Sequence, residues 1–164
     1  MRFIELFPGE AGLSAQVRAC GIPTETVLDV RYGGPDLATP QGLETVQTLL
    51  SAAPATKTVL HAAPPCAFMS RVRDRSILTR VRSPFHPEGL PGLPLLQAER
   101  VANSNQLADA TADLALANFQ QGGHSTIESP APSYIWQRPK FQALIAQGWT
   151  LRILDACQFG PPSN

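Results

Sequence analysis

The residue with the clearest chemical potential in this sequence is Cys66, which stands in the segment APPCAFMS over residues 63–70. Two prolines before it restrict the backbone, so the cysteine is held where a short apolar strand ends. A partly exposed cysteine near a helix start or basic groups favours the thiolate, which is the nucleophilic form. The alternative is a buried, unreactive cysteine, the commonest environment of a free thiol and the one that we expect for Cys20. The pattern therefore favours Cys66 as a nucleophile.

Glu128 is a second candidate, because it ends the strand-like segment HSTIE and is followed by Ser129-Pro130. If this strand lies beside the one that precedes Cys66, the carboxylate can act as an acid or as a hydrogen-bond partner of a substrate. The competing interpretation is a solvated glutamate at a strand end, since charged residues are mostly exposed. Proximity to Cys66 decides between the two.

A glycine-bearing turn, FPGEAGL, occupies residues 7–13. Gly9 and Gly12 allow its backbone to approach a ligand closely. Further along, Asp29 lies near the end of a strand-like segment, at a spacing that suits a carboxylate accepting hydrogen bonds from ribose hydroxyl groups. Glycine motifs often match by chance, so an ordinary turn followed by an ordinary aspartate remains the alternative.

The basic residues are unevenly distributed. Eleven of the thirteen are arginine, and five of these follow directly after the Cys66 segment. Arginine makes bidentate contacts to phosphates and base edges, which favours a nucleic-acid contact, although exposed charge runs are often simply solvated. The net charge is zero, so this prediction rests on local distribution alone. The predicted nucleic-acid-binding residues are Arg71, Arg73, Arg75, Arg80 and Arg82.

Strands and helices are expected to alternate along the chain, which predicts an α/β fold with a mostly parallel sheet. In such sheets ligands bind beyond the carboxyl ends of the strands, where the turn at Phe7, Asp29, Cys66 and Glu128 would all lie. The expected strands cover residues 2–7, 26–30, 58–63, 125–128 and 150–155. The expected helices cover residues 14–20, 97–121 and 139–147, with a further helix between Pro40 and Pro54.

The composition is that of one globular domain over residues 1–164, with 43% hydrophobic and 16% charged residues. Residues 64–96 form a long proline- and arginine-rich stretch, and a loop of this length inside a compact domain is usually functional or disordered. Neither the cysteines nor the histidines show a metal-ligand spacing. No segment resembles a membrane span or a secretory signal, so we expect an intracellular protein without a membrane partner.

Taken together, the segments FPGEAG, PPCAFMS, IESP and DACQFGPP resemble the ordered motifs of the DNA cytosine-5 methyltransferases. That family has an F-x-G-x-G-G turn, a P-C-Q-x-F-S loop, an E-N-V strand end and a D-Y-G-V-P-Q segment. The matching residues are Phe7, Gly9 and Gly12; Pro65, Cys66 and Ser70; Glu128; and Asp155, Gly160 and, with a one-residue shift, Pro162. The departures are Ala11 for a glycine, Ala67 for glutamine, and Ser129-Pro130 for Asn-Val.

The resemblance implies the Rossmann-like fold of S-adenosylmethionine-dependent methyltransferases, with DNA as the partner and RNA left open. S-adenosylmethionine would lie across the residues of the first motif, with Pro65 also at its site. Asp29 would bind the ribose, and Asp36 would accept from the adenine amino group. Cys66 would attack carbon 6 of a flipped cytosine while Glu128 stabilises the protonated nitrogen 3, so that carbon 5 takes the methyl group.

At the point where this chain reaches Asn164, the family has an arginine-bearing strand and then a target-recognition domain. The resemblance therefore implies that the last strand of the family fold is missing, and it leaves open whether another chain supplies the remaining part. We expect weak turnover by the isolated chain and self-association through an exposed strand at residues 150–155. An amino-methyltransferase is disfavoured by Ala63 and Cys66 beside the two prolines. A non-catalytic remnant that binds nucleic acid or a partner chain remains the alternative.

Overall fold

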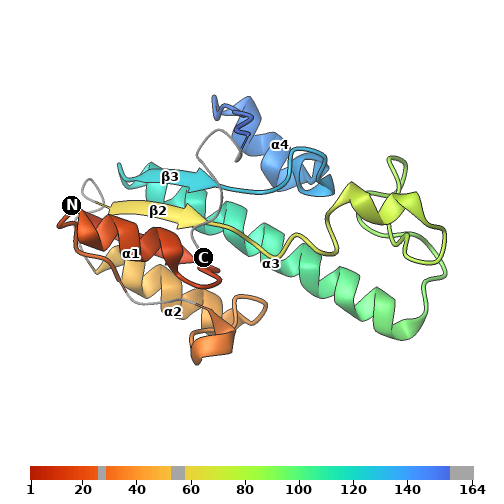
Figure 1. The fold of residues 1–164 in the computed structure, drawn as a ribbon, viewed down its shortest axis with the longest axis horizontal. Coiled ribbons are helices and arrows are strands. Elements are labelled where there is room, and N and C mark those ends of the chain that lie inside the picture. The colour runs from red at the N-terminus through yellow and green to blue at the C-terminus, as the bar shows by residue number, and fades with distance from the viewer. Residues whose placement is uncertain (26–28, 53–57, 156–164) are drawn as a thin grey trace.

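The computed structural model of the chain describes residues 1–25, 29–52 and 58–155. Three strands, β1 (Arg2–Leu6), β2 (Thr58–Ala62) and β3 (His124–Ile127), form an all-parallel sheet in the order β1-β2-β3. Helices flank this sheet (Figure 1). The prediction of an α/β fold with a parallel sheet flanked by helices is confirmed at this level.

The four described α-helices lie where the sequence predicts them, with ends shifted by a residue or two. They are α1 (Gly12–Ala19), α2 (Pro40–Ser51), α3 (Leu95–Gln120) and α4 (Pro139–Ala146). The start of α2 illustrates why the prediction works: Pro40 occupies the first turn, and the Thr39 hydroxyl accepts a hydrogen bond from the Gly42 backbone N–H at 3.1 Å. Such signals are local and can be read from the sequence directly.

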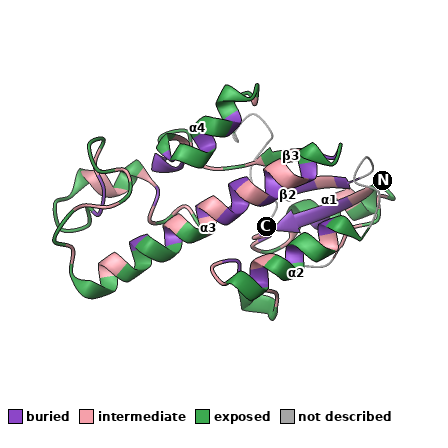
Figure 2. Cartoon of the chain, turned by 180° about the vertical axis from the view of Figure 1, so that it is seen from behind, coloured by how far each residue is buried: buried purple, intermediate pink, exposed green. Residues whose placement is uncertain are grey.

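The main core lies between the sheet and the helices α2 and α3. Ile4 of β1 and Leu60 of β2 are fully buried, and the same cluster contains Val46 of α2 and Leu114 of α3. Figure 2 shows this buried layer along the sheet and the facing side of α3. Alternate residues of β2 are buried and half-buried, so one face of this strand is covered more completely than the other.

The long helix α3 extends beyond the sheet, where it runs beside the loop between β2 and α3 (Figure 1). A second buried cluster joins Ala108 and Ala112 of α3 to Met69 in this loop and to Phe141 of α4. Two short 3-10 helices, η3 (Arg71–Arg75) and η4 (Tyr134–Gln137), belong to the same region. The segment that follows Cys66 is thus packed against the scaffold.

The predicted strand at residues 150–155 is wrong. This segment is not a strand, and its three large apolar side chains are more than half exposed. Gly148, with a φ of 94°, ends α4, and the Trp149 ring then packs edge-on against Phe119 with 5.7 Å between centroids. Residues 150–155 therefore add no strand to the sheet of β1, β2 and β3, and the edge expected to drive self-association is not formed.

The predicted strand at residues 26–30 lies partly outside the described residues. Its end is wrong, because Asp29 caps a 3-10 helix, η1 (Val30–Tyr32). Just upstream, Thr24 forms a parallel bridge with Phe3, whose backbone N–H donates to the Pro23 carbonyl at 2.8 Å. This part of the chain therefore runs along the edge of β1.

The expected burial of Cys20 is also wrong. The residue is exposed at the C-terminal cap of α1, because this short helix buries only Ser14 near its start. The family-like residues Gly160 and Pro162, together with Cys157, lie outside the described residues. Among the described helices, none combines the length and hydrophobicity that crossing a bilayer requires.

Candidate active site

A cavity of about 620 Å³ lies beyond the carboxyl ends of the three strands. The turn after β1, the segment around η1, the loop after β2, the residue after β3 and two side chains of α3 all contribute to it. The backbone continues the sheet at this point, since the Glu128 N–H donates to the Ala62 carbonyl and the Ala63 N–H to the Leu6 carbonyl. The lining residues are Phe7, Gly9, Asp29, Val30, Arg31, Pro35, Asp36, Leu37, Ala63, Pro64, Pro65, Cys66, Asn103, Leu107 and Glu128.

The turn between β1 and α1 has a strained backbone. Phe7 and Ala11 both have a φ of 57°, in the left-handed region that residues other than glycine rarely adopt, and Gly9 has a φ of 58°. A bulky residue in this conformation costs free energy and is typical of functional sites. Phe7 and Gly9 line the cavity, whereas Gly12, predicted to bind the cofactor, begins α1 and is not among the lining residues.

Replacing Ala11 by glycine is expected to raise the free energy of unfolding by about 1 kcal/mol, because the left-handed conformation costs alanine roughly that much. Urea unfolding followed by circular dichroism measures the change. The matched control is Ala15→Gly in the exposed interior of α1, which should instead lower stability by roughly 0.5–1 kcal/mol. A loss of stability in both variants would contradict the strain at Ala11.

Asp29 supplies a buried carboxylate to the cavity. Its Oδ1 accepts from the Arg31 backbone N–H at 2.9 Å and from Nε at 3.2 Å, and its Oδ2 accepts from Nη2 at 2.9 Å. The Arg31 side chain thereby holds the pKa of the Asp29 carboxyl below its usual value, although burial acts in the opposite direction. A carboxylate accepts about four hydrogen bonds, so Asp29 retains capacity for a further donor such as a hydroxyl group.

Asp36 also lines the cavity, from an exposed position in the turn before α2. Its Oδ1 accepts from the Ala38 N–H at 2.9 Å, which fixes the side chain in the turn. The Pro65 ring borders the same space. The predicted cofactor residues Phe7, Gly9, Asp29, Asp36 and Pro65 are thus brought together at one cavity.

Cys66 and Glu128 line this cavity as well. Cys66 is half-buried and begins a turn in which its carbonyl accepts from the N–H groups of Met69 at 2.9 Å and Ser70 at 2.8 Å. Glu128 is exposed and follows β3 directly. Cys66 and Glu128 thus follow two adjacent parallel strands and line one cavity. The exposure of Glu128 is also what the alternative of a solvated glutamate at a strand end expects, so its role stays a prediction.

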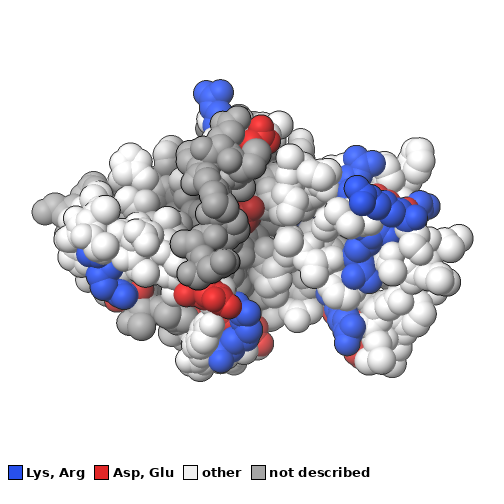
Figure 3. Space-filling model, in the orientation of Figure 1, with Lys and Arg blue, Asp and Glu red and all other residues white. Residues whose placement is uncertain are grey.

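The predicted nucleic-acid-binding arginines divide into two kinds. Arg71, Arg75 and Arg80 are exposed, and Arg73 is half-buried with its guanidinium carbon 4.5 Å from the centroid of the Phe68 ring. Figure 3 shows basic side chains gathered over this end of the molecule, on the right of the view. These residues form a basic surface on the loop that also carries Cys66.

Arg82 does not belong to that surface, and its predicted role is wrong. It is 1% exposed and donates to the carbonyl oxygens of Phe68 at 2.6 Å, of Val101 at 3.4 Å and of Pro87. Burial lowers the pKa of its guanidinium to about 10. Arg82 instead ties the loop to α3, because its guanidinium donates both to loop carbonyl groups and to the carbonyl of Val101 in the helix.

Several residues that line the cavity were not predicted as site residues, and three of them bear on its chemistry. Arg31 engages Asp29 through its side chain, and Asn103 and Leu107 reach the cavity from α3. The latter two stand four residues apart and therefore share one face of the helix. That spacing is visible in the sequence, but nothing in it indicates that this face of α3 meets the strand ends.

Within the described residues, no group of three histidine, cysteine or acidic side chains is placed to hold a metal ion. The chain was also compared with known proteins. No family model matches it, no curated protein matches it, and no solved structure matches it.

Proposed function

We propose that this chain transfers a methyl group from S-adenosylmethionine to carbon 5 of cytosine in nucleic acid, with DNA as the expected partner, through a covalent bond to Cys66. The observation that carries the proposal is one cavity lined by five of the expected cofactor residues and also by Cys66 and Glu128. Its volume of about 620 Å³ falls in the range of roughly 300–1,000 Å³ that is usual for cofactor and small-molecule sites.

The residues at the cavity fit the cofactor. The ionised, buried carboxylate of Asp29 suits the ribose hydroxyl groups, and Asp36 provides an acceptor for the adenine amino group. Gly9 lines the cavity without a side chain, which lets the backbone of this turn approach the ligand closely. When bound, S-adenosylmethionine supplies an electrophilic methyl group.

The side chains of the protein account for the remaining chemistry. The Cys66 thiolate forms a bond from Sγ to carbon 6 of the cytosine, and the electron pair of the 5–6 double bond moves to carbon 5. Glu128 holds a proton at ring nitrogen 3, which stabilises the charge that develops in the ring. After carbon 5 has been methylated, it loses its proton, the Sγ–carbon bond breaks, and the double bond and the thiolate are restored.

The chain is expected to bind S-adenosylhomocysteine, and Asp29→Ala should weaken that binding by about 1–3 kcal/mol, the contribution of a charge-assisted hydrogen bond. Isothermal titration calorimetry with the complete chain measures both affinities. Asp113→Ala is the matched control, because Asp113 pairs with Lys140 on the exposed side of α3. The absence of binding by the wild-type chain at millimolar ligand would overturn the cofactor assignment.

The exposed arginines are expected to contact phosphates. Replacing Arg71 and Arg75 together by alanine should weaken oligonucleotide binding and reduce the slope of log K against log salt by about 0.9 for each duplex phosphate that is no longer neutralised. Arg18→Ala combined with Arg152→Ala is the matched control, since both residues are exposed and outside the loop. Fluorescence anisotropy over a salt series gives the slopes, and identical slopes in the two double variants would contradict the role.

A further inference from the structure

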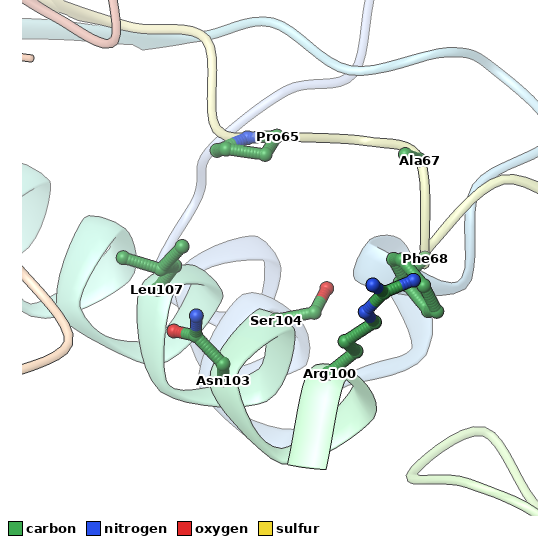
Figure 4. A pocket seen from close by; sticks show the side chains of 7 residues that line it. All are labelled: Pro65, Ala67, Phe68, Arg100, Asn103, Ser104 and Leu107. Carbon is green, nitrogen blue, oxygen red and sulfur yellow. The ribbon is translucent and has the colours of Figure 1, made fainter. Parts of the chain in front are cut away.

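A second cavity, of about 230 Å³, lies between the loop that carries Cys66 and the helix α3 (Figure 4). We call this second cavity the chamber. It adjoins the larger cavity, because both are lined by Pro65, Asn103 and Leu107. Cys66 stands between Pro65 and Ala67, which brings the chamber next to the proposed nucleophile. The chamber is lined by Pro65, Ala67, Phe68, Arg100, Asn103, Ser104 and Leu107.

Ser104 gives the chamber an unusual polar feature. The residue is 9% exposed, and its Oγ is buried without a hydrogen-bond partner among the described residues. A serine in a helix commonly bonds to the carbonyl four residues before it, but this hydroxyl instead points into the space between α3 and the loop (Figure 4). Because a buried hydroxyl without a partner is costly, a ligand that offers one is favoured here.

The rest of the chamber suits a flat ring beside a negative charge. Phe68, Pro65 and Leu107 provide apolar surface, and the Arg73 guanidinium lies over the Phe68 ring. Arg100 is exposed and borders the chamber near Phe68 (Figure 4). Aromatic and apolar walls, polar groups for a ring edge and a guanidinium for a phosphate are together the chemistry of a nucleotide site.

We propose that this chamber holds one nucleobase, that of the nucleotide next to the target cytosine. The inference rests on the proposed function, because the target base is assigned to the larger cavity at Cys66 and Glu128. At about 230 Å³ the chamber is below the usual range for a complete cofactor, and a single base is the smaller unit that a nucleic acid offers. The Ser104 hydroxyl and the Asn103 amide would then meet the edge of this base and make the site a determinant of sequence preference.

The test uses the complete chain with saturating S-adenosylhomocysteine and a short single-stranded oligonucleotide that contains one cytosine. Each neighbour of the cytosine is replaced in turn by an abasic nucleotide, and affinity is measured by fluorescence anisotropy. Removal of one neighbouring base should weaken binding to the wild-type chain by about 10-fold, the contribution of one stacked base. Ser104→Ala should weaken binding of the intact oligonucleotide by about 3- to 10-fold and Phe68→Leu by about 10-fold. In both variants the abasic substitution should then have a smaller effect.

Phe85→Leu is the matched control, because Phe85 is 90% exposed and outside the chamber. Binding of S-adenosylhomocysteine should be unchanged in all three variants, so a failure of the proposed function would show as the absence of cofactor binding by the wild-type chain. If cofactor and oligonucleotide bind but the abasic effect is the same in the wild-type chain and the chamber variants, the chamber proposal is overturned. If the wild-type chain binds free cytidine or adenosine and the Ser104→Ala variant does not, the chamber is still a nucleobase site. Its ligand would then be a free nucleoside and not a base of the oligonucleotide.

Discussion

Replacing Cys66 by alanine is expected to abolish a covalent complex between the chain and an oligonucleotide containing 5-fluorocytosine, formed in the presence of S-adenosylmethionine. The thiolate adds to carbon 6 and carbon 5 is methylated, but fluorine cannot leave as the proton does, so the Sγ–carbon bond persists. Intact-mass spectrometry measures the adduct. In the proposed reaction the Sγ atom of Cys66 forms the bond to the base, so the expected loss is complete and not partial.

Cys20→Ala is the matched control for that experiment, because Cys20 is an exposed thiol outside the cavity. It should form the adduct as the wild-type chain does, whereas Glu128→Gln should slow adduct formation by about 10²-fold or more, the usual contribution of a general acid. An adduct that survives Cys66→Ala and disappears with Cys20→Ala would exclude Cys66 as the nucleophile. Cofactor and nucleic-acid binding without any adduct would instead favour a non-catalytic binding protein.

Replacing Arg138 by alanine is expected to lower the free energy of unfolding by about 3 kcal/mol. The Arg138 side chain is 5% exposed and donates from Nε and Nη2 to the two carboxylate oxygens of Asp109 at 3.0 and 2.7 Å, with a further ion pair to Glu88. Removal of the guanidinium leaves the half-buried Asp109 carboxylate without its partner, and this uncompensated charge is the main source of the expected loss.

Urea unfolding followed by circular dichroism measures the effect of Arg138→Ala. The matched control is Lys140→Ala, since Lys140 also pairs with an aspartate of α3, Asp113, but both side chains of that pair are more than 40% exposed. An exposed ion pair contributes about 0–1 kcal/mol, so the control should lose far less stability. Similar losses in the two variants would show that burial does not distinguish the pairs.

The parts of the fold that the sequence predicts correctly depend on local signals. The helix after Thr39 has its cap and its proline, and the strand before Cys66 has its apolar run. The meeting of Cys66 and Glu128 at one cavity follows from a general rule, that ligands bind beyond the carboxyl ends of parallel strands. Neither the local signals nor this rule requires knowledge of contacts between distant parts of the chain.

The predictions that proved wrong concern features that depend on contacts between distant parts of the chain. Arg82 and Arg75 belong to the same basic run, yet only Arg82 meets buried carbonyl groups, one of them 19 residues away in the chain. The apolar residues at 150–155 suit a strand in composition, but a strand also needs a neighbour, and Trp149 packs on Phe119 instead. Asn103 reaches the cavity only because α3 crosses the strand ends. Each outcome is decided by tertiary contacts.

The anchoring of the loop between β2 and α3 has a thermodynamic consequence. Arg82 fixes its middle, and the Tyr134 hydroxyl donates to the Asp74 carboxylate of η3 at 2.6 Å. These contacts form when the chain folds, so the proposed association with nucleic acid should require little further ordering of the arginine-bearing surface. The heat-capacity change of association should then reflect only the area of contact, without the larger negative value that accompanies folding of a segment upon binding.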